Sequence, residues 1–292
     1  MKNFIFLNYS IVVKKIYFKN NQKFFFFNDE KILIIENNYD EKYIYELFRL
    51  SNELFFDGIK VNTFIINNFG RCFSTKNDNK IILLKTNDFN DFSFEKIVLF
   101  NGRKTNLDNY NILEEWKKEV DLFESEMTEY NKEHSIIKES LDFFIGCAEN
   151  AIELLNNYKR FIQNNNDSIG HRIDYNTFKM PLNDPFSFIK TNKMYDMANY
   201  FKYQLIINKI DYDKIDYVIN NNNEYENAFL FANLLFPNLY FIIAKNNILF
   251  NKNEEILCNL LYCKNRYINL LSYCMEKIKN VKDIKFINWI NK

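Results

Sequence analysis

The stretch IGHRIDYNTFKMPLNDPFSFIKTNKMYDMANYF, residues 169–201, decides how the rest of the chain is interpreted. It contains one of the two histidines and two of the three prolines of the sequence, and its acidic residues are Asp174, Asp184 and Asp196. Proline and asparagine favour turns, so we expect an irregular segment that holds carboxylates near a histidine. Such a group can exchange protons or bind Mg²⁺. A lone histidine beside an arginine in a loop is more often a hydrogen-bonded structural residue, and both interpretations stay open here.

The first hundred residues are predicted to be mainly strands. Short runs of aromatic and β-branched residues alternate with asparagine-rich turns. An amphipathic helix interrupts them, because Tyr43, Leu47, Leu50 and Leu54 repeat every three to four residues before Gly58. The expected strands are NFIFLN, SIVVKKIYF, KFFFFN, KILIIE, VNTFIIN, GRCFST, KIILLKT and the extended run FEKIVLFNG.

From about residue 108 the apolar period becomes helical. The predicted helices lie at 111–133, 140–155, 193–208, 225–244, 254–261 and 264–279, and the segment 169–190 interrupts them. We therefore predict an α+β fold with two lobes: a small antiparallel β lobe with one helix at 1–106, and a larger helical lobe at 107–292.

Composition excludes several functional classes. The formal net charge is zero and no basic stripe is present, which argues against nucleic-acid binding. An odd number of cysteines without ligand spacing indicates free thiols in a reducing compartment, and a cytoplasmic location is the default. The apolar window 228–244 contains Asn233, Pro237 and Asn238 and is somewhat short for a membrane span. A buried helix–turn–helix is favoured over a membrane helix.

No short motif settles the chemistry. The sequence lacks G-x-x-x-x-G-K-[ST], G-x-G-x-x-G, G-x-S-x-G and H-E-x-x-H. The order of its segments nevertheless resembles a known group of proteins. The stretches that carry the resemblance are LDFFIGCAENAIELL (141–155), IGHRID (169–174), MYDMANYFK (194–202) and LFANLLFPNLYF (230–241).

Together they resemble the aminoglycoside phosphotransferase and choline-kinase-like superfamily, which has the two-lobed protein-kinase-like fold. Within it, the chain looks most like the spore-coat-associated kinase-like proteins of low-GC Gram-positive bacteria. The resemblance implies that His171 occupies the histidine of the His-Gly-Asp catalytic loop. It also implies that Asp196 anchors that loop, and that Asp184 stands where a metal-binding aspartate is expected.

The chain departs from the family at the reacting residues. Arg172 and Ile173 stand where the family has glycine and the catalytic aspartate, and Asp174 is one residue late. In an extended loop such a slip turns the side chain to the other side. The position of the family's metal-binding asparagine falls on Phe178, with Asn176 nearby but out of register.

The expected nucleotide site is equally weak. The segment FKNNQKF has no glycine, so its backbone cannot approach phosphates closely. Lys31 opens the strand on which the family's phosphate-binding lysine lies further along, and Lys14 and Lys15 are alternatives. Glu46 on the following helix is the candidate partner of such a lysine, although its position also suits a solvated face.

Three functional hypotheses follow. The first is a kinase-like protein with a degenerate active site that acts as a non-catalytic binding or scaffold protein, without a cofactor and with another protein as its partner. The second is a divergent phosphotransferase that uses ATP and Mg²⁺, with Asp174, His171 and Asp184, on an alcohol acceptor. The third is a helical interaction protein unrelated to kinases. The oligomeric state is not predicted.

Overall fold

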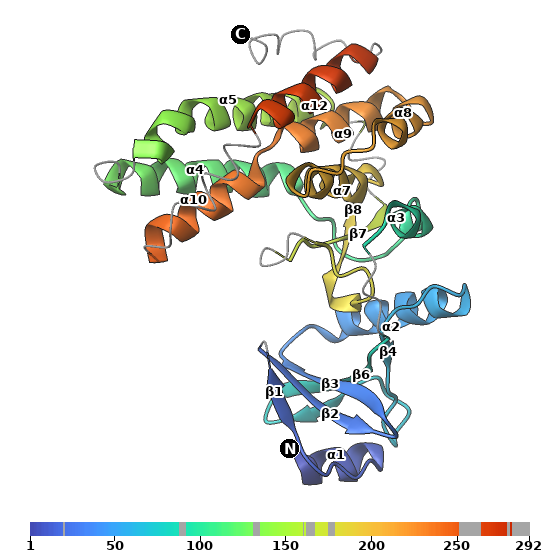
Figure 1. Ribbon diagram of the computed structural model, residues 1–292. Helices are drawn as coiled ribbons and strands as arrows, with labels where there is room; N and C mark the ends of the chain where they lie inside the picture. The colour runs from blue at the N-terminus through green and yellow to red at the C-terminus, as the bar shows by residue number, and fades with distance from the viewer. Residues whose placement is uncertain are drawn as a thin grey trace. The chain divides into compact units, whose positions relative to one another are not determined.

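The chain divides into two compact units (Figure 1). The sheet unit comprises residues 1–92, 105–107 and 181–188, and the helical unit comprises residues 93–104, 108–180 and 189–292. The sequence predicted a single boundary at 106/107. In the structure, residues 93–104 belong to the helical unit, and residues 105–107 and 181–188 belong to the sheet unit. The computed structural model describes residues 1–19, 21–87, 92–130, 135–159, 161, 167–174, 179–250, 264–278 and 281.

An antiparallel sheet forms the centre of the sheet unit. Its strands follow the order β1-β2-β3-β6-β4, and β5 also pairs with β6. Two hairpins are closed by Asn-Asp turns, at 28–29 and 77–78, whose four residues all have positive φ. Asparagine and aspartate tolerate this left-handed conformation, so these turns fix the strand register. The strands are β1 (Tyr17–Lys19), β2 (Gln22–Phe27), β3 (Glu30–Asn37), β4 (Thr63–Phe64), β5 (Ser74–Lys76) and β6 (Asn79–Lys85).

The first predicted strand, NFIFLN, is wrong: this segment lies in helix α1 (Lys2–Tyr9). Ile5 and Tyr9 are one helical turn apart and pack in one core cluster with Phe25 of β2. The Tyr9 hydroxyl donates to the Ile81 carbonyl oxygen at 2.8 Å. A short apolar run does not distinguish strand from helix, and packing on the sheet decides. Of the predicted strand SIVVKKIYF only its last residues enter β1.

Helix α2 (Glu41–Phe56) is confirmed where the apolar period predicted it. Leu47, Leu50 and Leu54 are buried, and the chain leaves the helix through Gly58 at φ 79°. The two helices α1 and α2 cover opposite faces of the sheet (Figure 1). Side chains of a strand alternate between faces, so β3 and β6 contribute to both layers.

A second predicted strand, in the helical unit, was also wrong. The run FEKIVLFNG was expected to be extended, but Phe94–Phe100 forms helix α3. Phe94, Ile97 and Phe100 recur every three residues and are all buried. The other helices are α4 (Ile112–Tyr130), α5 (Ser135–Asn157), α7 (Met194–Ile206), α8 (Tyr212–Asn220), α9 (Glu224–Leu235), α10 (Asn238–Phe250) and α12 (Lys264–Lys277).

Helices α7 and α9 form the core of this unit. They pack against each other, and α9 also packs against α5. The predicted helix–turn–helix is present: helix α9 ends at Leu235, and helix α10 begins at Asn238 after the turn Phe236–Pro237. The stretch Glu224–Lys245 is long and apolar enough to cross a membrane, yet 83% of its most apolar window is buried inside the protein. The predicted helix at 254–261 lies outside the described residues.

A small two-stranded sheet contacts helix α7 through β7. It consists of β7 (Ser168–His171) and β8 (Phe188–Thr191). The 3-10 turn η1 (Pro185–Ser187) immediately precedes β8. The observed architecture is the predicted α+β fold: an antiparallel sheet with helices, followed by a larger helical part.

Candidate functional site

His171 ends strand β7 and is bound to the first turn of helix α7. The two oxygens of the Asp196 carboxylate accept from the His171 backbone N–H at 2.9 Å and meet its ring Nδ1 at 2.6 Å. The histidine is fully buried, and its ring lies edge-on to Phe100 at 4.6 Å between centroids. Two bonds to one carboxylate fix both the backbone and the ring, so Asp196 positions this turn of the chain.

Gly170 permits this arrangement. A Cβ atom at Gly170 would lie 2.4 Å from Thr191 Cγ2 and 3.3 Å from Asp196 Oδ1. The first distance is far below a van der Waals contact, so only glycine fits between β8 and α7. Sequence reasoning did not assign Gly170 a role, because the neighbour that demands glycine lies 21 residues further along the chain.

The segment after His171 leaves the buried core. Arg172 is exposed, whereas Ile173 and Asp174 are half-buried. The Asp174 backbone N–H donates to the Lys179 carbonyl oxygen at 2.8 Å, which closes a short antiparallel bridge. The predicted positions Asn176 and Phe178 lie outside the described residues.

Asp184 caps a turn in the sheet unit. Its Oδ1 accepts from the Phe186 backbone N–H at 3.0 Å, at the start of η1. The Ser187 hydroxyl donates to the Asp184 carbonyl oxygen at 2.7 Å. His171, Asp174 and Asp196 belong to the helical unit instead. Within the described ranges, no three histidine, cysteine, aspartate or glutamate side chains converge as a metal site.

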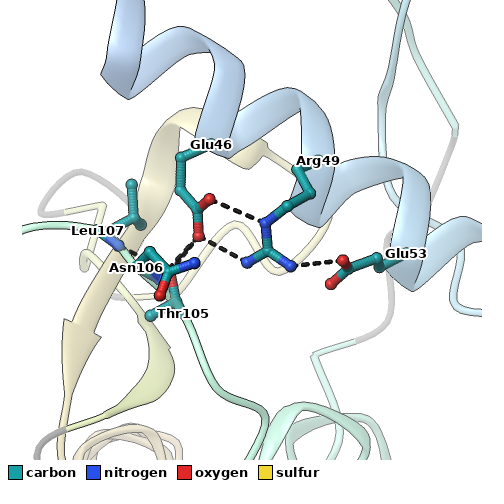
Figure 2. A network of polar contacts seen from close by, with 6 residues as sticks. All are labelled: Glu46, Arg49, Glu53, Thr105, Asn106 and Leu107. Atoms are coloured by element: carbon teal, nitrogen blue, oxygen red, sulfur yellow. Dashed lines mark hydrogen bonds and ion pairs between the residues drawn. The ribbon is translucent and has the colours of Figure 1, made fainter.

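Glu46 on α2 bonds to an arginine on its own helix (Figure 2). Its carboxylate accepts from Arg49 Nε at 2.9 Å and from Arg49 Nη2 at 2.7 Å. Arg49 also pairs with Glu53. The bonds from Arg49 hold the pKa of Glu46 below its usual value.

The same carboxylate reaches a segment distant in the sequence. It accepts from the Asn106 backbone N–H at 2.7 Å and from the Thr105 hydroxyl at 3.3 Å (Figure 2). The Thr105 hydroxyl in turn accepts from the Leu107 backbone N–H at 3.1 Å. Glu46 therefore joins residues 105–107 to α2, which explains why this short segment belongs to the sheet unit.

Lys31 makes an aromatic contact. Its ammonium lies 4.8 Å from the centroid of the Phe24 ring. Phe24 belongs to an aromatic cluster with Tyr17 and Phe26 on one face of β1 and β2, with centroids 5.4–5.8 Å apart. Lys15 lies over the Tyr17 ring at 5.0 Å. A cation over a ring face is attracted by the ring quadrupole, so both lysines are drawn to this cluster.

A buried lysine in α7 was not predicted. Lys202 Nζ donates to Asn233 Oδ1 at 3.1 Å, to the Phe236 carbonyl oxygen at 3.0 Å and to Asn238 Oδ1 at 3.2 Å. Burial lowers the pKa of Lys202 to about 7. Burial raises the pKa of the neighbouring Glu119 carboxyl, on α4, also to about 7. The apolar period of a helix gives no sign of such a pair, because its partners come from other helices.

Comparison with known proteins places the fold. No protein-family model and no curated protein matches the sequence. The aminoglycoside phosphotransferase of Alicyclobacillus acidocaldarius has a similar structure, with a TM-score of 0.70 and 11% identity over 96% of this chain and 97% of that one. A spectinomycin phosphotransferase solved with ADP and spectinomycin gives a TM-score of 0.52 and 11% identity, covering 99% of this chain and 97% of that one.

These similarities overturn the third hypothesis, a helical protein unrelated to kinases. The structural match covers 96% of this chain, so it includes residues of both the sheet unit and the helical unit. The chain has the kinase-like fold of the aminoglycoside phosphotransferases.

Proposed function

We propose that this chain is a non-catalytic binding protein with a kinase-like fold. The observation that carries the proposal is the structural use of its candidate carboxylates. Asp184 caps the turn η1, and Glu46 bonds to Arg49 and to the 105–106 segment. A carboxylate that is needed for local structure is a poor metal ligand or lysine partner, because each new role costs an existing hydrogen bond.

The catalytic loop supports the same conclusion. Ile173 occupies the position of the aspartate that orients the acceptor hydroxyl in the resembling family, and Asp174 follows one residue later. An isoleucine neither accepts a proton nor orients a hydroxyl. Phosphoryl transfer relies on positioning and on charge stabilisation, so the loss of this group removes a main contribution to rate.

The described residues do not fit a Mg²⁺-bound nucleotide. When bound, such a group would supply the phosphoryl donor and the metal charge. The acceptors of Glu46 are engaged by Arg49 and Asn106, and Lys31 lies over Phe24. The turn between β1 and β2 has no glycine to bring its backbone close to phosphates. We therefore propose that the partner of this chain is another protein in the cytoplasm and not a nucleotide.

The intact His171–Asp196 pair favours a second candidate. This pair anchors the loop in the family that the sequence resembles, and it is kept here with two short bonds. The second candidate is a divergent phosphotransferase that uses ATP and Mg²⁺ with Asp174 and Asp184, and an alcohol group as acceptor. One solved protein of this fold was bound to ADP.

A thermal-shift titration with ATP, with and without Mg²⁺, tests the proposal. A ligand at a hundred times its dissociation constant adds about 2.7 kcal/mol of stability to the state that binds it. We expect no Mg²⁺-dependent shift at millimolar ATP. A Mg²⁺-dependent shift that is lost in Asp174→Asn and Asp184→Asn, but kept in the control Asp167→Asn, would support the phosphotransferase instead.

A further inference from the structure

Helix α1 and the turn at 67–70 leave large apolar side chains uncovered in the sheet unit. Phe6 and Leu7 on α1 are 53% and 70% exposed, and Phe69 in the turn is 74% exposed. Val12, which follows α1, is 64% exposed. The inner side of α1 packs on the sheet (Figure 1). We call these four exposed side chains the α1 surface. A single exposed apolar residue is ordinary, whereas a group of them in one place indicates a binding surface.

Asn68 holds the parts of the α1 surface together. Its backbone N–H donates to the Asn8 carbonyl oxygen at 2.8 Å, and its side-chain amide donates to the Leu7 carbonyl oxygen at 3.1 Å. The Ser10 hydroxyl donates to Asn68 Oδ1 at 3.1 Å. Phe69 is the next residue in the chain, so these bonds keep it beside the end of α1. The apolar side chains of the helix and of the turn therefore belong to one surface.

The two segments that form this surface carry positive charge only. Residues 1–28 contain five lysines, and residues 58–77 contain two lysines and one arginine; neither segment contains an aspartate or a glutamate. The Lys2 ammonium donates to the Lys14 carbonyl oxygen at 2.6 Å, so these two lysines lie together at α1. Arg71 directly follows the turn. Within the described ranges, none of these three basic side chains has an ion pair with a carboxylate. Their charges are therefore available to attract an anionic surface.

The shape of the α1 surface favours a lipid bilayer over a protein as its occupant. Its side chains project from a helix and from a turn, so the surface is convex. A protein partner would have to match each projecting side chain with a pocket, whereas the interface of a bilayer accepts apolar side chains in any arrangement. Phenylalanine and leucine flanked by lysine are typical of segments that lie in a membrane interface. Anionic lipids attract basic side chains near the bilayer surface.

We propose that the α1 surface binds peripherally to an anionic lipid bilayer. Phe6, Leu7 and Phe69 enter the headgroup region, and the nearby basic side chains contact the lipid phosphates. No segment has to cross the bilayer in this arrangement. The inference goes beyond the proposed function, because it concerns where the chain is held and does not depend on whether its partner is a protein or ATP.

A tryptophan at the α1 surface tests the insertion directly. The purified full chain with Phe69→Trp is mixed with vesicles of equal parts phosphatidylcholine and phosphatidylglycerol, in which the phosphatidylcholine carries brominated acyl chains. Bromine quenches a tryptophan only when the indole enters the bilayer. Phe56→Trp is the control, because Phe56 is 84% exposed at the end of α2, on the opposite face of the sheet. We expect quenching of the added fluorescence for Phe69→Trp alone, with the unmodified chain as background.

Cosedimentation with unbrominated vesicles of the same composition separates the apolar from the charged contribution. The double variant Leu7→Gln, Phe69→Ser should bind about tenfold more weakly or worse, because two apolar side chains no longer leave water. The pair Lys14→Gln, Arg71→Gln should weaken binding by about tenfold at low salt and less at high salt. Phe56→Ser and Lys42→Gln, both exposed on α2, should change nothing. Vesicles of phosphatidylcholine alone should bind weakly.

All the replaced side chains are exposed, so each variant should keep its thermal unfolding midpoint, and a loss of binding is then not a loss of folding. Absence of binding to the anionic vesicles at low salt would overturn the proposal. Equal quenching of the two added tryptophans would overturn it as well, and so would undiminished binding of the double variant Leu7→Gln, Phe69→Ser. A dimer in gel filtration that this double variant converts to a monomer, without vesicle binding, would assign the α1 surface to a second copy of the chain instead.

Discussion

Gly170 shows how one residue controls the packing of strand β7, which ends in His171. Replacement by alanine puts a methyl group 2.4 Å from Thr191 Cγ2. We predict that Gly170→Ala lowers the free energy of unfolding by about 1–3 kcal/mol through overpacking, measured by urea denaturation. Thr191→Ser removes the opposing methyl group, so the double variant should lie close to Thr191→Ser alone. If Gly170→Ala is as stable as the unmodified chain, β7 and β8 do not pack as described.

Glu119 and Lys202 should give the helical unit a characteristic pH dependence. Burial raises the pKa of Glu119 from 4.5 to about 7, so the native state holds an extra proton between these values. The contribution of Glu119 to stability is present below pH 4.5 and is lost as pH rises through 7. Burial lowers the pKa of Lys202 from 10.5 to about 7, so its contribution increases as pH rises from 7 to 10.5.

We therefore predict that the summed contribution of Glu119 and Lys202 to the free energy of unfolding has a minimum near neutral pH. Urea unfolding at about pH 5, 7 and 9 measures it. Glu119→Gln should remove the fall below neutrality and Lys202→Met the rise above it. Glu114→Gln, a half-exposed position on the same helix that pairs with Lys117, should change neither slope. Identical pH profiles for all four proteins would show that Glu119 and Lys202 titrate normally.

At the scale of elements, Glu46 makes α2 an anchor for the 105–107 segment. Its carboxylate is 12% exposed and accepts from Arg49 and Asn106. We predict that Glu46→Gln costs about 1 kcal/mol at neutral pH, whereas Glu53→Gln, whose side chain is 54% exposed, costs a few tenths. The pKa of Glu46 is lowered, so its contribution is present above pH 4.5 and lost as pH falls through the native pKa.

The difference in free energy of unfolding between Glu46→Gln and Glu53→Gln should therefore become smaller at acidic pH. Chemical denaturation at neutral pH and near pH 3 measures it. Equal stability of Glu46→Gln and Glu53→Gln at neutral pH would mean that the bonds to residues 105–106 contribute nothing.

The prediction of elements succeeded where a period or a turn was explicit. The apolar period of Leu47, Leu50 and Leu54 predicted α2. Asn-Asp pairs at 28–29 and 77–78 indicated the turns of the two hairpins. It failed for α1 and α3, because NFIFLN and FEKIVLF are short apolar runs with aromatic residues that suit either structure. Tertiary packing decided both, through contacts that lie far away in the sequence.

The site was predictable only in part, for a related reason. His171 and Asp196 were proposed as a pair of loop and anchor from their spacing in a resembling family, and they are hydrogen-bonded. Glu46 bonds to residues 105–106, and the Lys202 ammonium donates to acceptors on Asn233, Phe236 and Asn238. These partners lie 30 or more positions away in the sequence, so no local pattern reveals them. The roles predicted for Lys31, Glu46, Asp174 and Asp184 stay predictions.

At the scale of the whole molecule, the chain shares its fold with a phosphotransferase to which it is only 11% identical, over 96% of this chain and 97% of that one. Patterns of apolar burial and turn residues are enough to preserve an architecture, while the chemistry depends on a few side chains. This chain has the fold of a phosphotransferase and a hydrogen-bonded His171–Asp196 pair, and Ile173 stands at the position where the resemblance led us to expect an aspartate. Function therefore has to be argued from these residues and not from the fold.

The most direct test of a non-catalytic role is the turnover of ATP by the purified chain. The release of ADP in the presence of Mg²⁺ should be followed for the unmodified chain, for Asp174→Asn and for the control Asp167→Asn. We predict that all three give the same rate as a blank without protein, with alcohols or amino sugars present as acceptors. A Mg²⁺-dependent rate that Asp174→Asn abolishes and Asp167→Asn keeps would contradict the account.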